Sequence, residues 1–499
     1  MSRRLATIGL ICAALCLACV IGYRLLDTPF WNVNGSRLMP SFELSRGVNY
    51  YVLLPPGGPL YSTLYGPLVA LVYLPATWFS TPNSAVLAGA MITVLLCFSA
   101  AAYLHFAKSG CGAGDIAAFL AAGFLMCYLE PLKYSCFNIH ADGPGLAFSS
   151  AACGSLYGAP YGRLSGARLL ISATCAVLAL LCKQMFLPVP FVLLAWLAVV
   201  AGRGIAVRYL AWLVAAGAVL GGIALWTSGP ERLYHCLIWL PAHHPWGASA
   251  LVSAIQAMRS FVRVSLPVLI LLLAYAIYLA AGGVRGTSLR YLAAHRCVPL
   301  LAVGVALAPF SIAGRAKIGG DVNSLSFATF FLVCGLTVML ADLAQPLAQS
   351  VLIAIIVLLA VSEAPLALDI RSKVRQLPQA SQEVAFEYLR RHPGEAYFPW
   401  FPLAHFCAEH KFRHYGFGIG DRLLAGESVS MAEFRAYVPA NPRIIAFSSD
   451  GRPDAFGFDL MKYLPAFRDQ VTDPELPGWL LYAKAPPVQS LREPRSQSN

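Results

Sequence analysis

The chain has 499 residues, of which 58% are hydrophobic and only 12% are charged. Soluble proteins carry about 25% charged residues, so the composition excludes an ordinary cytosolic enzyme, a disordered chain and a coiled coil. It predicts an α-helical polytopic membrane protein. The net charge of +12 lies almost wholly in the first 364 residues, which hold 20 Lys and Arg against 9 Asp and Glu. In a membrane protein such residues are first of all topology signals, so no nucleic-acid partner is expected.

A transmembrane helix needs about 20 mostly apolar residues. The first apolar run follows Arg3 and Arg4 and lacks a signal-peptide cleavage site, which predicts a retained helix. We expect about 11–13 transmembrane helices. The apolar runs are residues 5–26, 60–79, 85–107, 116–129, 143–156, 169–182, 185–201, 209–227, 264–281, 298–313, 325–341 and 351–363.

Basic residues in short loops give the topology, because such loops stay in the cytoplasm. They are Arg3, Arg4, Lys108, Arg163, Arg168, Arg203, Arg208, Arg285, Arg290 and Arg296. All of them fall on one side if residues 60–79 do not make a single crossing. That run contains Pro67 and Pro75, and proline kinks a helix, so we expect a bent or re-entrant helix at the outer face. Eleven helices then cross, the N-terminus is cytoplasmic, and a long first outer loop spans residues 27–84. The other expected outer loops are residues 130–142, 183–184, 228–263 and 315–323.

The composition changes after Glu363 to Pro-, Arg- and Glu-containing sequence. Ser381–Arg391 has the spacing of an amphipathic helix, and residues 443–447 and 479–483 are typical of strands. We therefore predict a membrane domain (1–364), a small periplasmic α/β domain (365–486) and a disordered tail (487–499). The Gly-Phe-Gly-Ile-Gly sequence at 416–420 lacks a following Lys-Ser/Thr and a βαβ pattern, so a plain loop is expected there.

The predicted outer loops hold basic residues that topology does not explain, and we single out five of them. Charges near the bilayer boundary are costly and often functional, although single ones also extend to the lipid headgroups. Five such residues on the same side of the membrane together indicate an anion site. They are Arg37, Lys133, Lys183, Arg315 and Lys317.

Two outer motifs carry acids. In the first, His140 and Asp142 precede a Gly-Pro that begins an apolar run, where Asp142 could instead only cap the helix. The second, residues 315–323, holds two cations, two glycines, Asp321 and Asn323. This composition gives a loop with backbone freedom and cations to meet a phosphate. The neighbouring pair Lys183-Gln184 marks a short outer turn or a buried polar pair.

These motifs, in this order, resemble a family. The chain resembles the bacterial GT-C membrane glycosyltransferases, which are similar to the dolichyl-phosphate-mannose mannosyltransferases. The matching stretches are residues 46–51, 59–61, 65–68, 140–144, 180–184 and 317–323, followed by an outer C-terminal domain.

The resemblance implies that a sugar moves from a polyprenyl-phosphate donor to a hydroxyl of a cell-envelope glycan, lipid or protein. This would occur on the outer face of a bacterial inner membrane. Such transfer needs a base for the acceptor proton and groups that stabilise the departing phosphate. Asp142 or Glu43 would be the base, with His140 orienting or relaying. The five outer cations would bind the carrier phosphate.

The remaining matched positions are expected to contact substrate. Asp321 and Asn323 would hold sugar hydroxyls or a divalent cation, and Tyr65 and Gln184 lie in matched motifs. No metal ligand is assigned, because His243-His244 has no acid close in sequence and is favoured as an interfacial loop element.

One position departs from the family. An acid usually stands about thirteen residues before the Gly matched to Gly47, and here that position is Asn34, which is expected at the substrate but cannot act as a base. Either Asp142, which we favour, or Glu43 takes the role, or the loop is matched wrongly, or the chemistry is altered. The alternative functions are a transporter or lipid flippase and a relative that has lost its base.

Overall fold

The computed structural model describes residues 3–27, 32–51, 63–108, 111–157, 162, 164–247, 249–281, 293–343, 346–413, 416–436, 438–448 and 459–484. The matched stretch 59–61 and the tail 487–499 lie outside these residues.

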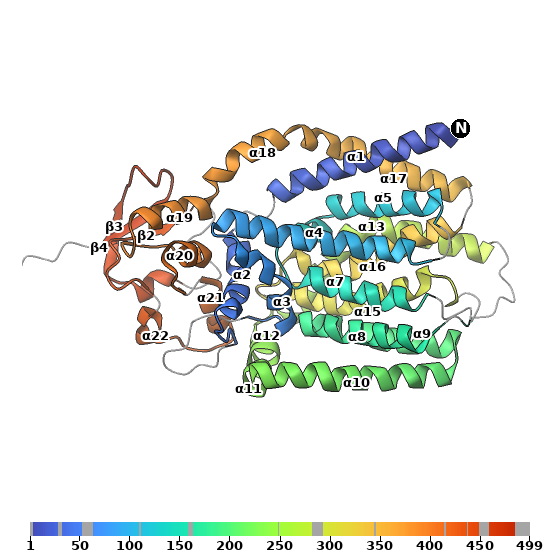
Figure 1. Cartoon of the computed structure of the whole chain (residues 1–499), viewed down its shortest axis with the longest axis horizontal. Helices are drawn as coiled ribbons and strands as arrows, with labels where there is room; N and C mark the ends of the chain where they lie inside the picture. The colour runs from blue at the N-terminus through green and yellow to red at the C-terminus, as the bar shows by residue number, and fades with distance from the viewer. Residues whose placement is uncertain are drawn as a thin grey trace, which may run out of the picture.

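Most of the chain forms a bundle of helices that run along the long axis of the molecule (Figure 1). In the described part, seven helices are long and apolar enough to cross a membrane. The seven helices confirm the predicted fold class. These helices are α1 (Arg3–Asp27), α4 (Pro82–Phe106), α10 (Arg203–Ser228), α13 (Ala250–Ala281), α15 (Cys297–Ala316), α16 (Ser326–Asp342) with η5 (Val322–Leu325), and α17 (Pro346–Leu368).

Shorter apolar helices complete the bundle. The helices α5 (Ala113–Tyr128) and α6 (Glu130–Phe137) form a pair bent by 91°, which counts as an eighth span if taken together. The others are α7 (Asp142–Ser155), α8 (Gly166–Cys182), η3 (Gln184–Phe186) and α9 (Pro188–Val200). A number of crossings above eight therefore stays a prediction.

The run 60–79 does not form one spanning helix in its described part. It folds as α3 (Pro67–Val72) and η1 (Leu74–Trp78), two short helices beside α2 (Asn32–Ser45). Gly66 comes before α3, and its N–H donates to the Cys182 carbonyl at 2.9 Å. Pro67 occupies the first helical turn, where its missing N–H has no cost. This close approach joins the segment before α3 to the end of α8.

The expected outer loop 228–263 is wrong in its second half. Three short turns, α11 (Pro230–Tyr234), the π-helix η4 (His235–Trp239) and α12 (Leu240–His243), are followed by α13 from Ala250 onward. The predicted loop ended at Arg263, before the apolar run 264–281, whereas Arg259 and Arg263 lie on the helix with exposed side chains. At 1.5 Å per residue, 32 residues are about 48 Å long. Such a helix is longer than a bilayer core of about 30 Å, so it has room for charges at one end.

The C-terminal part contains a four-stranded sheet in the order β1-β2-β4-β3. β1 (Ala396–Tyr397) pairs parallel with β2 (Ile444–Phe447), and β4 (Leu480–Lys484) pairs antiparallel with both β2 and β3 (Phe467–Val471). The predicted helix is α19 (Ser381–Arg391), and the two predicted strands are β2 and β4. The other elements are α18 (Ile370–Gln376), η6 (Leu377–Gln379), α20 (Pro402–Glu409), α22 (Met431–Ala436) and η8 (Leu460–Tyr463).

The glycine-rich stretch 416–420 is not a loop but the start of α21 (Gly416–Leu424), which corrects the prediction. Its Ile419 is fully buried in the core of the C-terminal part. Tertiary packing therefore outweighs the low helix propensity of glycine.

The C-terminal part contacts the end of the bundle opposite the N-terminus (Figure 1). Phe42 of α2 and Phe406 of α20 lie edge to face at 5.2 Å. The Asn83 N–H donates to Glu383 of α19 at 3.1 Å. His235 of η4 lies 3.0 Å from Glu427, just after α21. These contacts place α21 over this end of the bundle.

An ionic cluster lies inside the C-terminal part. His405 Nδ1 lies 3.1 Å from Glu409, which also accepts the Gly394 N–H at 2.8 Å. Burial alone would raise the pKa of Glu409, but these hydrogen bonds and the charges of His405 and Arg413 outweigh it and lower the pKa to about 2.

Candidate functional site

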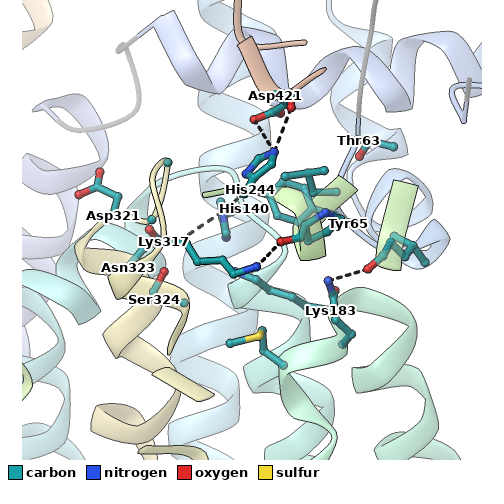
Figure 2. A pocket seen from close by; sticks show the side chains of 18 of the residues that line it. Thr63, Tyr65, His140, Lys183, His244, Lys317, Asp321, Asn323, Ser324 and Asp421 are labelled. Carbon is teal, nitrogen blue, oxygen red and sulfur yellow. Dashed lines mark hydrogen bonds and ion pairs between the residues drawn. The ribbon is translucent and has the colours of Figure 1, made fainter. Parts of the chain in front are cut away.

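A cavity of about 840 Å³ lies at the end of the bundle that contacts the C-terminal part, below α21. Its walls come from α2, the segment before α3, η3, the turns η4 and α12, and the loop between α15 and η5. Figure 2 shows Tyr65, His140, Lys183, Lys317 and Asn323 gathered around this space, with Asp421 above them. Elements far apart in sequence thus converge on one site.

The segment between α6 and α7 is held on both sides. Asn34 of α2 accepts the Ile139 N–H at 2.9 Å and donates to the Asn138 side chain at 2.8 Å. The Tyr73 hydroxyl donates to the His140 carbonyl at 2.9 Å. These buried hydrogen bonds fix the backbone of the segment, and with it the direction in which the His140 side chain points.

Asp142 is fully buried at the start of α7. One carboxylate oxygen lies 2.8 Å from Lys183 Nζ and 2.8 Å from His140 Nδ1. The other accepts from Ser135 at 3.0 Å and from Asn323 at 2.9 Å. Asp142 does not line the cavity. It lies behind the residues that do and binds them together.

His140 lines the cavity and connects Asp142 to Tyr65. Its Nε2 lies 2.7 Å from the Tyr65 hydroxyl. The Asp142 N–H also points at Nδ1, at 3.3 Å, but the 2.8 Å contact with a carboxylate, which only accepts, assigns a proton to Nδ1. Burial lowers the pKa of His140, so the ring is neutral and its Nε2 accepts the phenol O–H.

Three cations from the described part of the chain line the cavity. Lys183 pairs with Asp142 and lies 4.6 Å from the centre of the Phe327 ring. Arg37 donates to the Ile139 carbonyl and the Tyr134 hydroxyl, and Lys317 donates to the Pro241 and Ala242 carbonyls. Among the described residues, neither Arg37 nor Lys317 has a carboxylate within ion-pair distance. Their charges are therefore available to an anion.

The loop between α15 and η5 is shaped by its own residues. Gly319 has a φ of 84°, which favours glycine. Arg315 donates to the Gly320 carbonyl at 2.8 Å and does not line the cavity, so it braces the loop. Asp321 lines the cavity and caps η5 by accepting the Val322 N–H. Gln184 also lines the cavity and donates to the Leu237 carbonyl at 3.0 Å.

Several predicted site residues are not brought to the cavity. Lys133 of α6 and Glu43 of α2 do not line it, and Asn34 braces the His140 segment instead of facing it. Glu43 is 1% exposed, and neither carboxylate oxygen has a partner among the described residues. Burial raises its pKa well above the usual range. It is thus a buried acid of α2, away from the position of a base at this cavity.

The sequence did not single out some residues that the structure places here. Ser135 and Tyr73 carry no motif, although both lie in the expected outer segments. His244, judged an interfacial loop residue, lines the cavity, and its Nε2 contacts the Asp421 carbonyl at 3.1 Å. No sequence signal joins two residues 177 apart. The described residues contain no cluster of three or more His, Cys, Asp or Glu side chains placed to hold a metal ion.

No protein-family model and no curated protein matches the sequence. Solved structures do. ArnT from Cupriavidus metallidurans bound to undecaprenyl phosphate matches with a TM-score of 0.58 and 11% identity, covering 97% of this chain and 98% of that one. ArnT from the same organism in the apo state matches with a TM-score of 0.55 and 14% identity, covering 96% and 98%. ArnT is a GT-C glycosyltransferase. The protein therefore has the ArnT fold over nearly its whole length, and the predicted GT-C-like fold is confirmed.

Proposed function

We propose that the protein is a membrane glycosyltransferase that moves a sugar from a polyprenyl-phosphate donor to a hydroxyl acceptor. The observation that carries this is the pair Arg37 and Lys317. Both cations line the cavity, and their contacts are neutral carbonyl and hydroxyl oxygens and the rings of Tyr134 and Trp246. A half-buried charge without a counter-charge is costly. A phosphate would supply charge-assisted hydrogen bonds that are stronger than those to neutral oxygens.

The cavity also suits an isoprenoid chain. Its wall at η4 and the loop after α15 includes Ile238 and Ile318, which are 57% and 39% exposed. Covering such apolar surface is favourable by about 25 cal/mol per Å². An amphiphile with a phosphate head and an apolar tail therefore fits this site better than a free sugar phosphate does.

The ArnT structure with undecaprenyl phosphate supports the same donor class for this fold. In the proposed complex Lys183 assists Arg37 and Lys317 at the phosphate, which stabilises the leaving group. Asn323, Gln184 and Asp321 line the same cavity and contact sugar hydroxyls. The acceptor is a hydroxyl of a cell-envelope glycan, lipid or protein, and the reaction takes place at the periplasmic face of a bacterial inner membrane.

The test is to incubate the purified protein in nanodiscs with a labelled polyprenyl-phosphate sugar and candidate acceptors. We expect donor-dependent release of the free carrier phosphate, and Arg37→Gln or Lys317→Gln should raise the KM for the donor. Arg263→Gln is the matched control, because Arg263 is exposed on α13 and does not line the cavity. An intact donor that only changes bilayer leaflet would instead indicate a flippase.

A further inference from the structure

Transfer to a hydroxyl requires a group that takes the acceptor proton, and that group must face the cavity. Asp142 does not meet this condition. It is fully buried and absent from the cavity wall, and four donors already occupy its two oxygens. Glu43 and Asn34 do not line the cavity either. The two acids that the sequence suggested as the base, Asp142 and Glu43, are thus both out of contact with a substrate in this cavity.

A chain of hydrogen bonds connects Asp142 to the cavity. Asp142 holds His140 Nδ1 at 2.8 Å, and His140 Nε2 accepts from the Tyr65 hydroxyl at 2.7 Å. Tyr65 and His140 both line the cavity, and Tyr65 is the less buried of the two. The order is that of a Ser-His-Asp triad with a phenol in place of the serine hydroxyl. The Tyr51 hydroxyl donates to the Tyr65 carbonyl at 2.7 Å, which fixes the phenol's backbone.

We propose that Tyr65 and His140 relay the acceptor proton and that Asp142 is a positioning residue that holds His140 and stabilises its charged form. This inference rests on the proposed function. The acceptor oxygen bonds to the anomeric carbon as the bond from that carbon to the carrier phosphate breaks, and the phosphate leaves with the electron pair. The acceptor proton passes to the Tyr65 oxygen while the phenol proton passes to His140 Nε2. The proton is then lost to water.

The electrostatics of the site act on both members of the relay. Burial raises the pKa of Tyr65, which opposes a free tyrosinate, but in a relay the phenol is neutral before and after the step. Burial lowers the pKa of His140, and the Asp142 carboxylate opposes this shift. The imidazolium that forms beside Asp142 is therefore partly compensated and short-lived, and it passes its proton on to water. Asn34 braces the segment that carries His140. The amide at position 34 therefore helps to position His140 and does not itself act as a base.

The decisive variant is Tyr65→Phe, which removes one oxygen atom and keeps the ring. We expect the kcat for transfer to fall by roughly 10²–10⁴-fold, with the Kd for unglycosylated polyprenyl phosphate unchanged. His140→Gly should lose activity to the same extent, and added imidazole should restore part of it, because the cavity adjoins the vacated position. Tyr103→Phe is the matched control, since the Tyr103 hydroxyl bonds Ser155 and lies outside the cavity wall.

Asp142→Asn should lower kcat and change its pH profile, as expected of a residue that acts through His140. Wild-type kcat in Tyr65→Phe would overturn the relay, as would a folded His140→Gly that imidazole does not rescue. If His140→Gly does not fold, Tyr65→Phe decides alone. Absence of transfer by the wild-type protein would instead refute the proposed function, so the two failures are distinguishable.

Discussion

Replacing Asp142 by Asn tests the charge at the centre of the site. The substitution keeps the shape of the side chain and removes its negative charge. Lys183, whose side chain is only 13% exposed, then loses its counter-charge, and His140 Nδ1–H loses a carboxylate acceptor. Lys183→Met is the reciprocal change, because Met keeps the apolar stem beside Phe327 and removes the ammonium group.

The magnitudes follow from burial. Removing one partner of a buried ion pair costs about 3–5 kcal/mol, because the other charge is left uncompensated. Each single variant should therefore lower the free energy of unfolding by about 3 kcal/mol. The double variant leaves no uncompensated charge, so its loss should be smaller than the sum by about 2 kcal/mol.

The assay is reversible unfolding in mixed micelles of a mild detergent and dodecyl sulfate, followed by tryptophan fluorescence for the wild-type protein and three variants. The coupling between the two positions is the quantity of interest. Strictly additive losses, or a single Lys183→Met variant as stable as the wild-type protein, would refute the reasoning that these two charges neutralise each other inside the fold.

Three further predictions concern the frame around the site. Gly66→Ala should lower stability by about 1–3 kcal/mol or more, because an added Cβ would overlap the Leu181 carbonyl oxygen, whereas Gly221→Ala meets nothing within 4 Å. Glu409→Gln should cost about 3 kcal/mol at pH 7, since the lowered pKa of the folded protein contributes stability above about pH 4.5 that is lost as the pH falls toward 2. Asn34→Asp should not raise the transfer rate, because position 34 does not line the cavity, and it should lower the Tm by removing a buried amide donor.

The measurements that check these predictions are simple. Thermal unfolding should separate Gly66→Ala from its helix-interior control Gly221→Ala, and equal Tm values would contradict the close approach of α3 to α8. The stability difference between the wild-type protein and Glu409→Gln should shrink on acidification, and a difference independent of pH would contradict the ionised cluster. A faster Asn34→Asp enzyme would show that position 34 reaches the substrate.

The helical bundle was largely predictable because long apolar runs rarely form anything other than membrane-spanning helices. α19 begins and ends at the predicted residues, since amphipathic spacing stops at a Pro-Gly pair. The start of α13 was misjudged because the apolar run begins only at residue 264, after Arg259 and Arg263, whose exposed side chains lie on the helix. The glycines of α21 indicated a loop because nothing local shows that Ile419 is buried. The local sequence pattern thus predicts a helix or strand well where contact with solvent or lipid determines its structure.

The site was predictable in part. His140, Asp142, Lys183 and Asn323 were expected on one side of the membrane, and the structure brings them into contact. The side of the membrane on which a residue lies does not determine whether its side chain points into the cavity or away from it. For this reason Lys133 was placed at the phosphate with Arg37, although only Arg37 lines the cavity.

The role of a residue within the site depends on how deeply it is buried behind the cavity wall as well as on its side of the membrane. Asp142 was expected to be the base, whereas the structure puts it behind His140, out of contact with the cavity. The pairing of His244 with Asp421 joins the membrane helices to the C-terminal part and leaves no trace in either local sequence. Such distinctions arise only from tertiary packing.

The central claim is glycosyl transfer from a lipid phosphate, and one measurement tests it most directly. A polyprenyl-phosphate sugar labelled differently in the sugar and in the lipid phosphate is incubated with the protein and a cell-envelope acceptor fraction. We predict one sugar on the acceptor for each carrier phosphate released, and loss of both products together in Tyr65→Phe. A donor that stays intact, or crosses the bilayer with both labels still joined, would contradict the claim.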